Sequence, residues 1–395
     1  MSSTPTNNTP TVMDLYLGYR FKALNTDSWA KAPEDWDTIR KTCTYPRNHY
    51  YFPLLKLDVQ IPNYWWVGPL SSPGDLGALE RLPHDIITKI AGYLDVESFL
   101  QFRNVNGKAH CITTDLPEFR RLMRHAPRAV ISLIRTGLSA HVSFGNLYEA
   151  LTTARCHFCE GFGPLLFLPT CTRTCHECLR KEPSMAVVGT EEILTYGTNF
   201  PVYGNKNTLK KIIKVLDDSD MRTFKVQKWL KPTKMSKKMR GVLVNDLLAH
   251  WIGKDMNKRR EELFLKEWLN YRTAACVKYP YLNISTGVLE SGVSCTGCQN
   301  KFGERTGYPD GRRGVSAVPD GSEERDRCYT NKEFEEHFET CEAAQQLWMG
   351  RGQTVVDRDE WFTLIGGLNF GANEMEDYVD RYRHMLPAES DNEPF

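Results

Sequence analysis

The pattern of apolar positions is most regular between residues 82 and 153, where it predicts a series of short helices. In the first of them the apolar side chains recur every three to four residues, the spacing of one helical face: Ile86, Ile87, Ile90, Tyr93 and Leu94. Pro83 suits the first helical position, where its missing N–H costs nothing, and Asp95 suits the N-cap of a second short helix. Three more amphipathic segments follow without strand-like alternation: 116–123, 130–138 and 144–151. A mainly α fold is therefore expected.

Outside this region the pattern is weaker. Residues 12–75 carry many aromatic residues among prolines, with no sustained period. We expect an ordered arm that packs on a domain, with an exposed aromatic surface for a partner as the alternative. The first eleven residues, rich in Ser, Thr, Asn and Pro, are expected to form a disordered tail, and residues 71–75 a linker. Residues 191–275 are expected to be mostly helical.

Composition bears on the class of protein. With 395 residues, of which 41% are apolar and 25% charged, the chain can bury a large core and hold more than one domain. The net charge is +1, so no global field favours nucleic acid. No apolar run approaches the roughly 20 residues of a membrane helix, and no secretory signal pattern opens the chain. We therefore expect an intracellular protein, cytoplasmic or nuclear, with no membrane contact.

Two blocks of opposite charge cancel in this balance. Residues 206–240 hold twelve Lys and Arg against three Asp, and residues 357–395 hold ten Asp and Glu against three Arg. A run of like charge is usually a solvated surface, and no recognition-helix pattern beside a zinc finger accompanies the basic block. A zinc-stabilised nucleic-acid-binding or regulatory protein is therefore kept as the alternative.

Cysteine spacing indicates a first metal site. Seven of the twelve cysteines are clustered, and in an intracellular chain such clusters are more often metal ligands or catalytic groups than disulfides. Two C-x-x-C pairs, fifteen residues apart, supply four thiols: Cys156, Cys159, Cys175 and Cys178. Two such turns complete a tetrahedron around zinc at about 2.3 Å and leave no open position, so a structural zinc site with four cysteine ligands is predicted. The apolar residues 162–168 between the pairs predict a short hairpin.

Other residues near this cluster have expected roles. Cys171 could replace a ligand, although a buried free cysteine is the preferred interpretation. His157 and His176 are expected at the surface. Four basic side chains are placed to offset the negative charge of the thiolates: Arg155, Arg173, Arg180 and Lys181.

A second cluster joins a C-x-x-C pair to a helix that follows thirty-eight residues later, with four expected ligands: Cys295, Cys298, His337 and Cys341. Thr330 and Glu333 form a capping-box pair that opens this helix. His337 and Cys341 lie at i and i+4, so they project from one helical turn. A structural zinc site with three cysteine ligands and one histidine is predicted, with Cys328 as an alternative ligand. Residues 303–327, rich in Gly, Pro and charge, are expected to be a mobile surface loop whose lobe unfolds when the metal is removed.

Residues 79–123 resemble an F-box, and the matching positions are Leu82, Pro83, Ile86, Ile87, Ile90, Leu94, Asp95, Ser98, Leu100, Phe102 and Val105. After Val105 the chain departs from the family pattern, which leaves the packing of the third helix open. A cysteine-knuckle pair after the box is similar to that of filamentous-fungal F-box proteins. So is a late group of residues that consists of Phe334, His337, Cys341, Leu347 and Trp348.

The resemblance implies an adaptor rather than an enzyme. In the family the apolar face of the box binds the Skp-type linker subunit of a cullin–RING ubiquitin ligase. The residues that it implies for this contact are Leu82, Pro83, Ile86, Ile90, Leu94, Leu100 and Val105. The rest of the chain would hold a protein substrate near the ubiquitin-charged enzyme. The alternative is that these side chains form an ordinary helical core. A RING enzyme is not expected, because residues 156–178 hold too few ligands, and a thiol oxidoreductase would need a βαβ pattern.

Together these observations predict a mainly α chain in which an F-box precedes an irregular α-rich body held by two structural zinc ions. The expected segments are a disordered tail with an aromatic-rich arm (1–75), the F-box (76–125), a helical connector with the four-cysteine zinc site (126–190), a basic helical middle (191–275), the lobe with the three-cysteine, one-histidine zinc site (276–350) and an acidic C-terminal segment (351–395).

Overall fold

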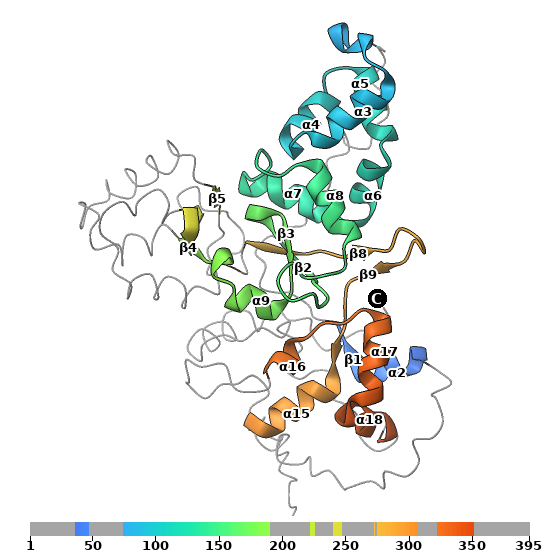
Figure 1. Cartoon of the computed structure of the whole chain (residues 1–395), viewed down its shortest axis with the longest axis vertical. Helices are drawn as coiled ribbons and strands as arrows, with labels where there is room; N and C mark the ends of the chain where they lie inside the picture. Colours follow the sequence, from blue (N-terminus) through green and yellow to red (C-terminus); the bar gives the residue numbers. More distant parts are fainter. Residues whose placement is uncertain are drawn as a thin grey trace, which may run out of the picture.

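The computed structural model describes residues 36–46, 74–189, 222–225, 240–246, 272, 275–306 and 322–350. Most of these residues are helical, in agreement with the expected mainly α class. Helices of residues 84–152 lie at one end of the molecule and helices of residues 296–349 at the other, with short strands between them (Figure 1). Among the described residues, no helix has both the length and the apolar character needed to cross a bilayer.

The first helical group follows the predicted segments closely. A 3-10 helix, η2 (Gly77–Arg81), precedes six α-helices: α3 (His84–Tyr93), α4 (Val96–Arg103), α5 (Gly107–Asp115), α6 (Pro117–His125), α7 (Pro127–Thr136) and α8 (Phe144–Thr152). Asp95 caps α4 as predicted, because its side chain accepts a hydrogen bond from the Ser98 N–H at 2.8 Å. Pro83 lies one position earlier than predicted, at the N-cap of α3.

A buried aromatic cluster joins these helices. The Phe99 ring of α4 stacks on Phe144 of α8, with ring centroids 4.2 Å apart, and on Phe119 of α6 at 5.5 Å. All three side chains are at most 3% exposed. The helices of the proposed box therefore share one core with the helices that follow it. The boundary expected at residue 125 does not separate two cores.

A small sheet lies below this helical group. Its strands are β2 (Leu165–Phe167), β3 (Thr172–Thr174) and β7 (Cys276–Lys278), in the order β3-β2-β7 and antiparallel throughout. Strands β2 and β3 form the hairpin predicted between the cysteine pairs, and β7 joins it from more than 100 residues away. The Tyr279 hydroxyl, just beyond β7, donates to the Leu147 carbonyl of α8 at 2.7 Å and fixes the sheet against the helices.

Further short elements surround the sheet. They are η3 (Leu168–Thr170), α9 (His176–Lys181), η4 (Pro183–Met185), the hairpin β8 (Tyr281–Leu282) with β9 (Leu289–Glu290), and a second sheet of β4 (Val187–Gly189), β6 (Arg240–Leu243) and β5 (Thr223–Lys225). Most of the predicted helical middle and of the basic block lies outside the described residues, as does the acidic segment 351–395. Within the middle, the described strands β5 and β6 were not foreseen.

The far end of the molecule combines distant segments. It contains β10 (Ser294–Cys295), α15 (Thr296–Thr306), α16 (Ser322–Asp326), α17 (Asn331–Thr340) and α18 (Glu342–Met349). Residues from the N-terminal arm complete it, as α2 (Trp36–Cys43) and β1 (Thr44–Tyr45). Strand β1 pairs with β10 so that Thr44 faces Cys295, and Ile39 and Cys43 are fully buried in this lobe. The expectation of an arm that packs on a domain is thus confirmed for residues 36–45, and the rest of the arm lies outside the described residues.

The predicted loop 303–327 is wrong where the structure describes it. Helix α15 continues to Thr306, and residues 322–326 form α16. Arg325 and Asp326 of α16 are at most 1% exposed. Their charge indicated solvent exposure, whereas each charge here is compensated inside the protein.

Candidate metal centres and an exposed helical face

The four cysteines of the first cluster come together as predicted. Their sulfur atoms all lie within 4.8 Å of one another, and Cys159 is the exposed member of the group. The Sγ atoms of Cys159 and Cys175 are 3.6 Å apart. Ligands at about 2.3 Å from a shared zinc ion would have tetrahedral edges of about 3.8 Å, so the spacing suits a common metal ion. We call this group the first centre.

Local backbone geometry creates the first centre. The Cys156 N–H donates to the Gly161 carbonyl at 2.6 Å and closes the first turn, in which Glu160 takes a positive φ of 60°. Cys175 caps α9, and its sulfur accepts a hydrogen bond from the Cys178 N–H at 3.4 Å. A hydrogen bond from the Cys175 thiol, together with backbone N–H groups, lowers the pKa of Cys156 to about 4. The turn therefore favours thiolate, the form that binds metals.

One expectation about the neighbours of the first centre needs correction, and another gains detail. His176 is buried at 2% exposure rather than at the surface, because α9 packs its first turn inward; His157 is exposed as expected. Arg173 interacts electrostatically with Cys156, as expected, and its guanidinium also donates to the carbonyls of Ala150, Tyr279 and Pro280. It joins the hairpin to α8 and to the chain after β7. Burial lowers the pKa of Arg173 to about 10, so it stays charged at neutral pH.

The second cluster also comes together, with two thiols from the turn after β10 and two ligands from the α17 region. The Cys341 sulfur lies 3.9 Å from that of Cys295 and 3.7 Å from that of Cys298, and the His337 Nε2 lies 3.4 Å from the Cys298 sulfur. All four ligand atoms lie within 4.8 Å of one another. Hydrogen bonds from the Cys295 and Cys298 thiols lower the pKa of Cys341 far below its ordinary value. We call this group the second centre.

One detail of the second centre differs from the prediction. Helix α17 begins at the predicted capping box, in which Thr330 and Glu333 bond reciprocally, but it ends at Thr340. Cys341 has φ −93° and ψ 92°, and a new helix, α18, starts directly after it. The sulfur thus reaches the centre from a break between helices rather than from the same helix as His337.

Tyr329 is a part of the second centre that the sequence did not indicate. Its hydroxyl lies 3.3 Å from Nδ1 of His337, and the two rings stack with centroids 4.6 Å apart. This contact occupies one ring nitrogen and directs the other, Nε2, to the sulfurs. Outer partners of this kind fix the tautomer and orientation of a metal-binding histidine. A single tyrosine eight residues before the histidine carries no recognisable pattern in the sequence.

The two spare cysteines stay outside the centres. Cys171 lies in a left-handed turn, with φ 52°, and burial together with the nearby Glu149 raises its pKa to about 12. Cys328 is 3% exposed and its sulfur lies 3.4 Å from the Ser294 hydroxyl. Neither belongs to a group of ligand atoms that could share an ion among the described residues. The preferred interpretation of Cys171 as a free, largely buried thiol agrees with this geometry.

The face of α3 that points away from the core is apolar and exposed. Ile86 and Ile90 are each 41% exposed, whereas the adjacent Ile87 is 5% exposed and packs inward. Other large apolar side chains near this helix are also exposed: Leu79, Leu82, Tyr93 and Val105. The alternative of an ordinary core helix is wrong for this face. Two of the seven residues expected on it, Leu94 and Leu100, are instead half-buried against the core.

The packing of the third helix, which the sequence left open, depends on Arg103. This side chain is 2% exposed, and its guanidinium donates to the His110 carbonyl and to the hydroxyls of Thr113 and Thr114 on α5. It also lies over the Phe119 ring, 4.5 Å from the centroid. Helix α5 is thus held to α4 by a buried arginine, at the place where the chain departs from the family pattern.

Neither the family models, nor the curated proteins, nor the solved structures contain a match to this chain. The function must therefore be inferred from the residues and their geometry.

Proposed function

We propose that this chain is a non-catalytic F-box adaptor of a cullin–RING ubiquitin ligase. Its box, residues 76–125, would bind a Skp-type linker subunit and through it the cullin. The body, held by two structural zinc ions, would present a protein substrate for ubiquitination. Such a protein acts inside the cell, in the cytoplasm or the nucleus.

The observation that carries this proposal is the apolar face of α3. Monomeric proteins rarely leave contiguous large apolar side chains in water unless a partner covers them. Here five of the residues that the F-box resemblance assigns to the linker are exposed: Leu82, Pro83, Ile86, Ile90 and Val105. Four of them lie on α3 or directly before it, and Val105 lies between α4 and α5; these helices are at the end of the molecule farthest from α15 and α18 (Figure 1). A helical partner that offers an apolar groove fits such a row.

Zinc is the metal that best suits both centres. Four-coordinate sites made of four cysteines, or of three cysteines and one histidine, are typical of structural zinc, and thiolate ligands exclude the hard cations Mg²⁺ and Ca²⁺. Each centre supplies four protein ligands, so a tetrahedral ion would have no free position for water or substrate. The expected role is structural, which agrees with a non-catalytic protein.

A pull-down with a matched control tests the proposal. The full chain, the variant Leu82→Ala/Ile86→Ala and the control Ile284→Ala/Val288→Ala would each be recovered from cells and analysed for linker and cullin by mass spectrometry. Ile284 and Val288 are 54% and 49% exposed, so the control removes equally exposed apolar groups from the β8–β9 hairpin region. We expect linker and cullin with the wild type and the control, and their loss from the α3 variant. Recovery of no linker with any form would overturn the proposal.

Metal content is measured separately on the purified chain by elemental analysis. We expect two zinc ions per chain, and one fewer in a Cys178→Ser or a Cys298→Ser variant. A chain that holds no zinc would remove the metal part of the proposal without affecting the docking part.

A further inference from the structure

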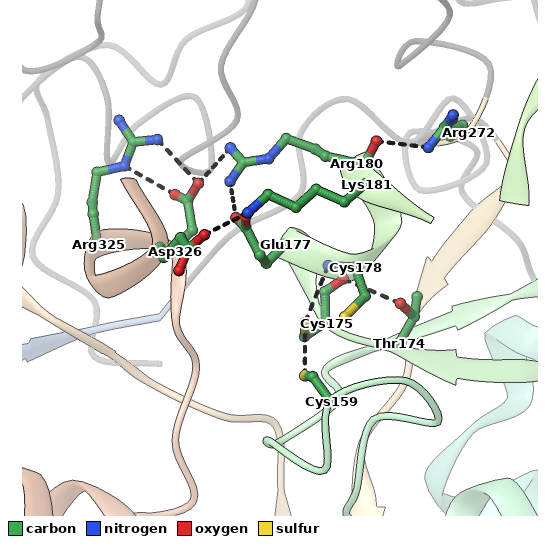
Figure 2. A network of polar contacts seen from close by, with 11 residues as sticks. Cys159, Thr174, Cys175, Glu177, Cys178, Arg180, Lys181, Arg272, Arg325 and Asp326 are labelled. Atoms are coloured by element: carbon green, nitrogen blue, oxygen red, sulfur yellow. Dashed lines mark hydrogen bonds and ion pairs between the residues drawn. The ribbon is translucent and has the colours of Figure 1, made fainter. Parts of the chain in front are cut away.

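A network of charges, exposed at Lys181 and Glu323 and buried at Asp326, joins the helix of the first centre to a helix that leads into the second (Figure 2). On α9, Glu177 lies between the ligands Cys175 and Cys178, and it pairs with Arg180 and Lys181. From α16, Glu323 pairs with Lys181, and Asp326 pairs with Arg180. The two helices are almost 150 residues apart in sequence, yet their charged side chains form ion pairs with each other.

Asp326 is the centre of this network. Its side chain is 1% exposed and its Oδ2 lies 2.5 Å from Nη1 of Arg180, which is itself 10% exposed. Its second cation is Arg325, whose Nε and Nη2 lie 2.9 Å and 3.1 Å from the carboxylate oxygens. A buried carboxylate is tolerated only when such partners compensate its lost hydration. The position of α16 therefore depends on where α9 holds Arg180.

The position of α9 depends in turn on the first centre. The helix begins directly after Cys175, and its third residue is Cys178. Two of the four metal ligands thus lie in its cap and first turn. When the metal is removed, no ion holds the four cysteine side chains together. The first turn of α9 is then no longer fixed by Cys175 and Cys178.

On the other side, α16 leads directly into the second centre. Three residues after Asp326 comes Tyr329, which contacts the ring of the ligand His337. The Arg325 guanidinium lies 4.0 Å from the centroid of Phe302 on α15, the helix whose first turn carries Cys298. The network therefore holds both the outer partner of His337 and the helix that supplies a thiolate.

A second connection runs in parallel. Arg155, which precedes the ligand Cys156, pairs with Glu333, the residue that closes the capping box of the His337 helix. Gly292, at φ 80°, passes so close to Phe162 that a Cβ there would overlap the ring. These two contacts join the segment around Cys156 to the segments around β10 and α17, and they do not involve Asp326.

We propose that the two metal centres bind their ions cooperatively, with Asp326 as the principal link. The inference rests on the proposed function in that both centres must hold a metal, and it assigns a regulatory property to them. Loss of the ion from the first centre lowers the affinity of the second, and the reverse holds by thermodynamic reciprocity. Loss of one ion then makes loss of the other easier.

The test measures zinc affinity of the second centre in the full chain, by competition with a chromophoric chelator. The first centre is removed with Cys159→Ser, a change at its exposed ligand. The measurement is made in three backgrounds: wild type, Asp326→Asn and the control Asp37→Asn. Asp37 also pairs with an arginine, Arg40, but its side chain is 76% exposed. We expect Cys159→Ser to weaken the second centre about tenfold or more in the wild-type and Asp37→Asn backgrounds, the size of typical coupling between sites. In Asp326→Asn the factor should fall below about threefold.

If Cys159→Ser weakens zinc binding at the second centre equally in all three backgrounds, Asp326 is not the link. If it weakens that binding less than about twofold in the wild-type background, the two centres are not coupled. Hydrogen exchange provides a readout that needs no Asp326 variant. In Cys159→Ser, the amides of α16 and α17 should exchange faster than in the wild type, and unchanged exchange there would refute the inference. A wild-type chain with fewer than two zinc ions would overturn the metal proposal and the coupling together, whereas two independent ions would overturn the coupling alone.

Discussion

Replacing Phe99 by alanine should loosen the whole helical end of the molecule, not the box alone. Phe99 is fully buried, and its ring stacks on both Phe144 of α8 and Phe119 of α6, which also contact each other. Alanine at this position removes the side chain that holds three helices together. One of those helices, α8, lies wholly outside the box as the sequence delimits it (residues 76–125).

The size of the effect follows from the burial. Truncation of a buried phenylalanine costs about 3–5 kcal/mol, because the transferred surface and the residual cavity both contribute. Phe99 contacts two rings at once, so stacking contributes on top of area, and about 4 kcal/mol is expected. Since 1.4 kcal/mol is a factor of ten, the local opening equilibrium should rise roughly 10³-fold.

Hydrogen exchange measured by mass spectrometry resolves this effect by segment. In Phe99→Ala, amides of α4, α6 and α8 should all exchange faster, while α17 and α18, at the other end of the molecule, keep the wild-type rate (Figure 1). Ile86→Ala is the matched control, because the Ile86 side chain is 41% exposed and faces away from this core.

A result confined to the box would refute the reasoning. If α3, α4, α5 and α6 lose protection while α8 retains its own, the box is a separate folding unit. The boundary expected at residue 125 would then stand, and the shared aromatic core would have little energetic weight.

Three further changes should have measurable effects. Asp95→Ala should cost about 1 kcal/mol by loss of the α4 cap, and Asp95→Asn much less, since Asn caps equally well. Burial opposes ionisation of Asp95, but hydrogen bonds from Ser98 prevail and lower its pKa, so wild-type stability should show a loss as pH falls below about 4 that the Asn variant lacks. Tyr329→Phe should weaken zinc binding about tenfold in chelator competition, because the hydroxyl that orients His337 is gone; unchanged affinity would mean that ring stacking suffices. Chelation should expose the amides of residues 36–45 to exchange while helices 84–152 stay protected, and equal protection with and without metal would contradict a structural role for the ion.

The metal ligands could be predicted from the sequence because most of their geometry is local. A C-x-x-C turn brings two thiols together whatever the rest of the chain does, and two such turns are enough for the first centre. The second centre needed only one more pair, His337 and Cys341. The interpretation of that pair as one helical turn was wrong in detail, since the helix ends at Thr340, but four residues of separation still bring both side chains to the same place.

Helix existence was predictable and helix orientation was not. The spacing of apolar residues in α3 correctly indicated a helix, but it placed Ile86 and Ile87 on one face. In the structure Ile87 enters the core and Ile86 is exposed. Periodicity identifies apolar positions without distinguishing those that the chain covers itself from those left for a partner. Only the packing of α5 and α8 against α3 decides between them.

Contacts between distant segments could not be predicted from the sequence for a different reason. The pairing of β1 with β10 and of β2 with β7 joins very short strands that have no alternating pattern of their own. Likewise, the charges of residues 322–326 indicate a surface loop until Arg180 is placed beside them. Such features depend on two segments at once, and neither segment alone carries the information.

The order of these segments along the chain has a mechanical consequence for an adaptor. Residues 36–45 pack in the lobe of the second centre, so the proposed box lies in the sequence between two parts of one body rather than at its end. Phe99 and Tyr279 then fix the box helices to α8 and the central sheet. An adaptor acts by proximity, which requires a constant distance between its docking face and whatever the body holds. A box on a flexible tether would lose that distance, whereas the contacts of Phe99 and Tyr279 would keep the docking face of the proposed adaptor at a fixed distance from the central sheet.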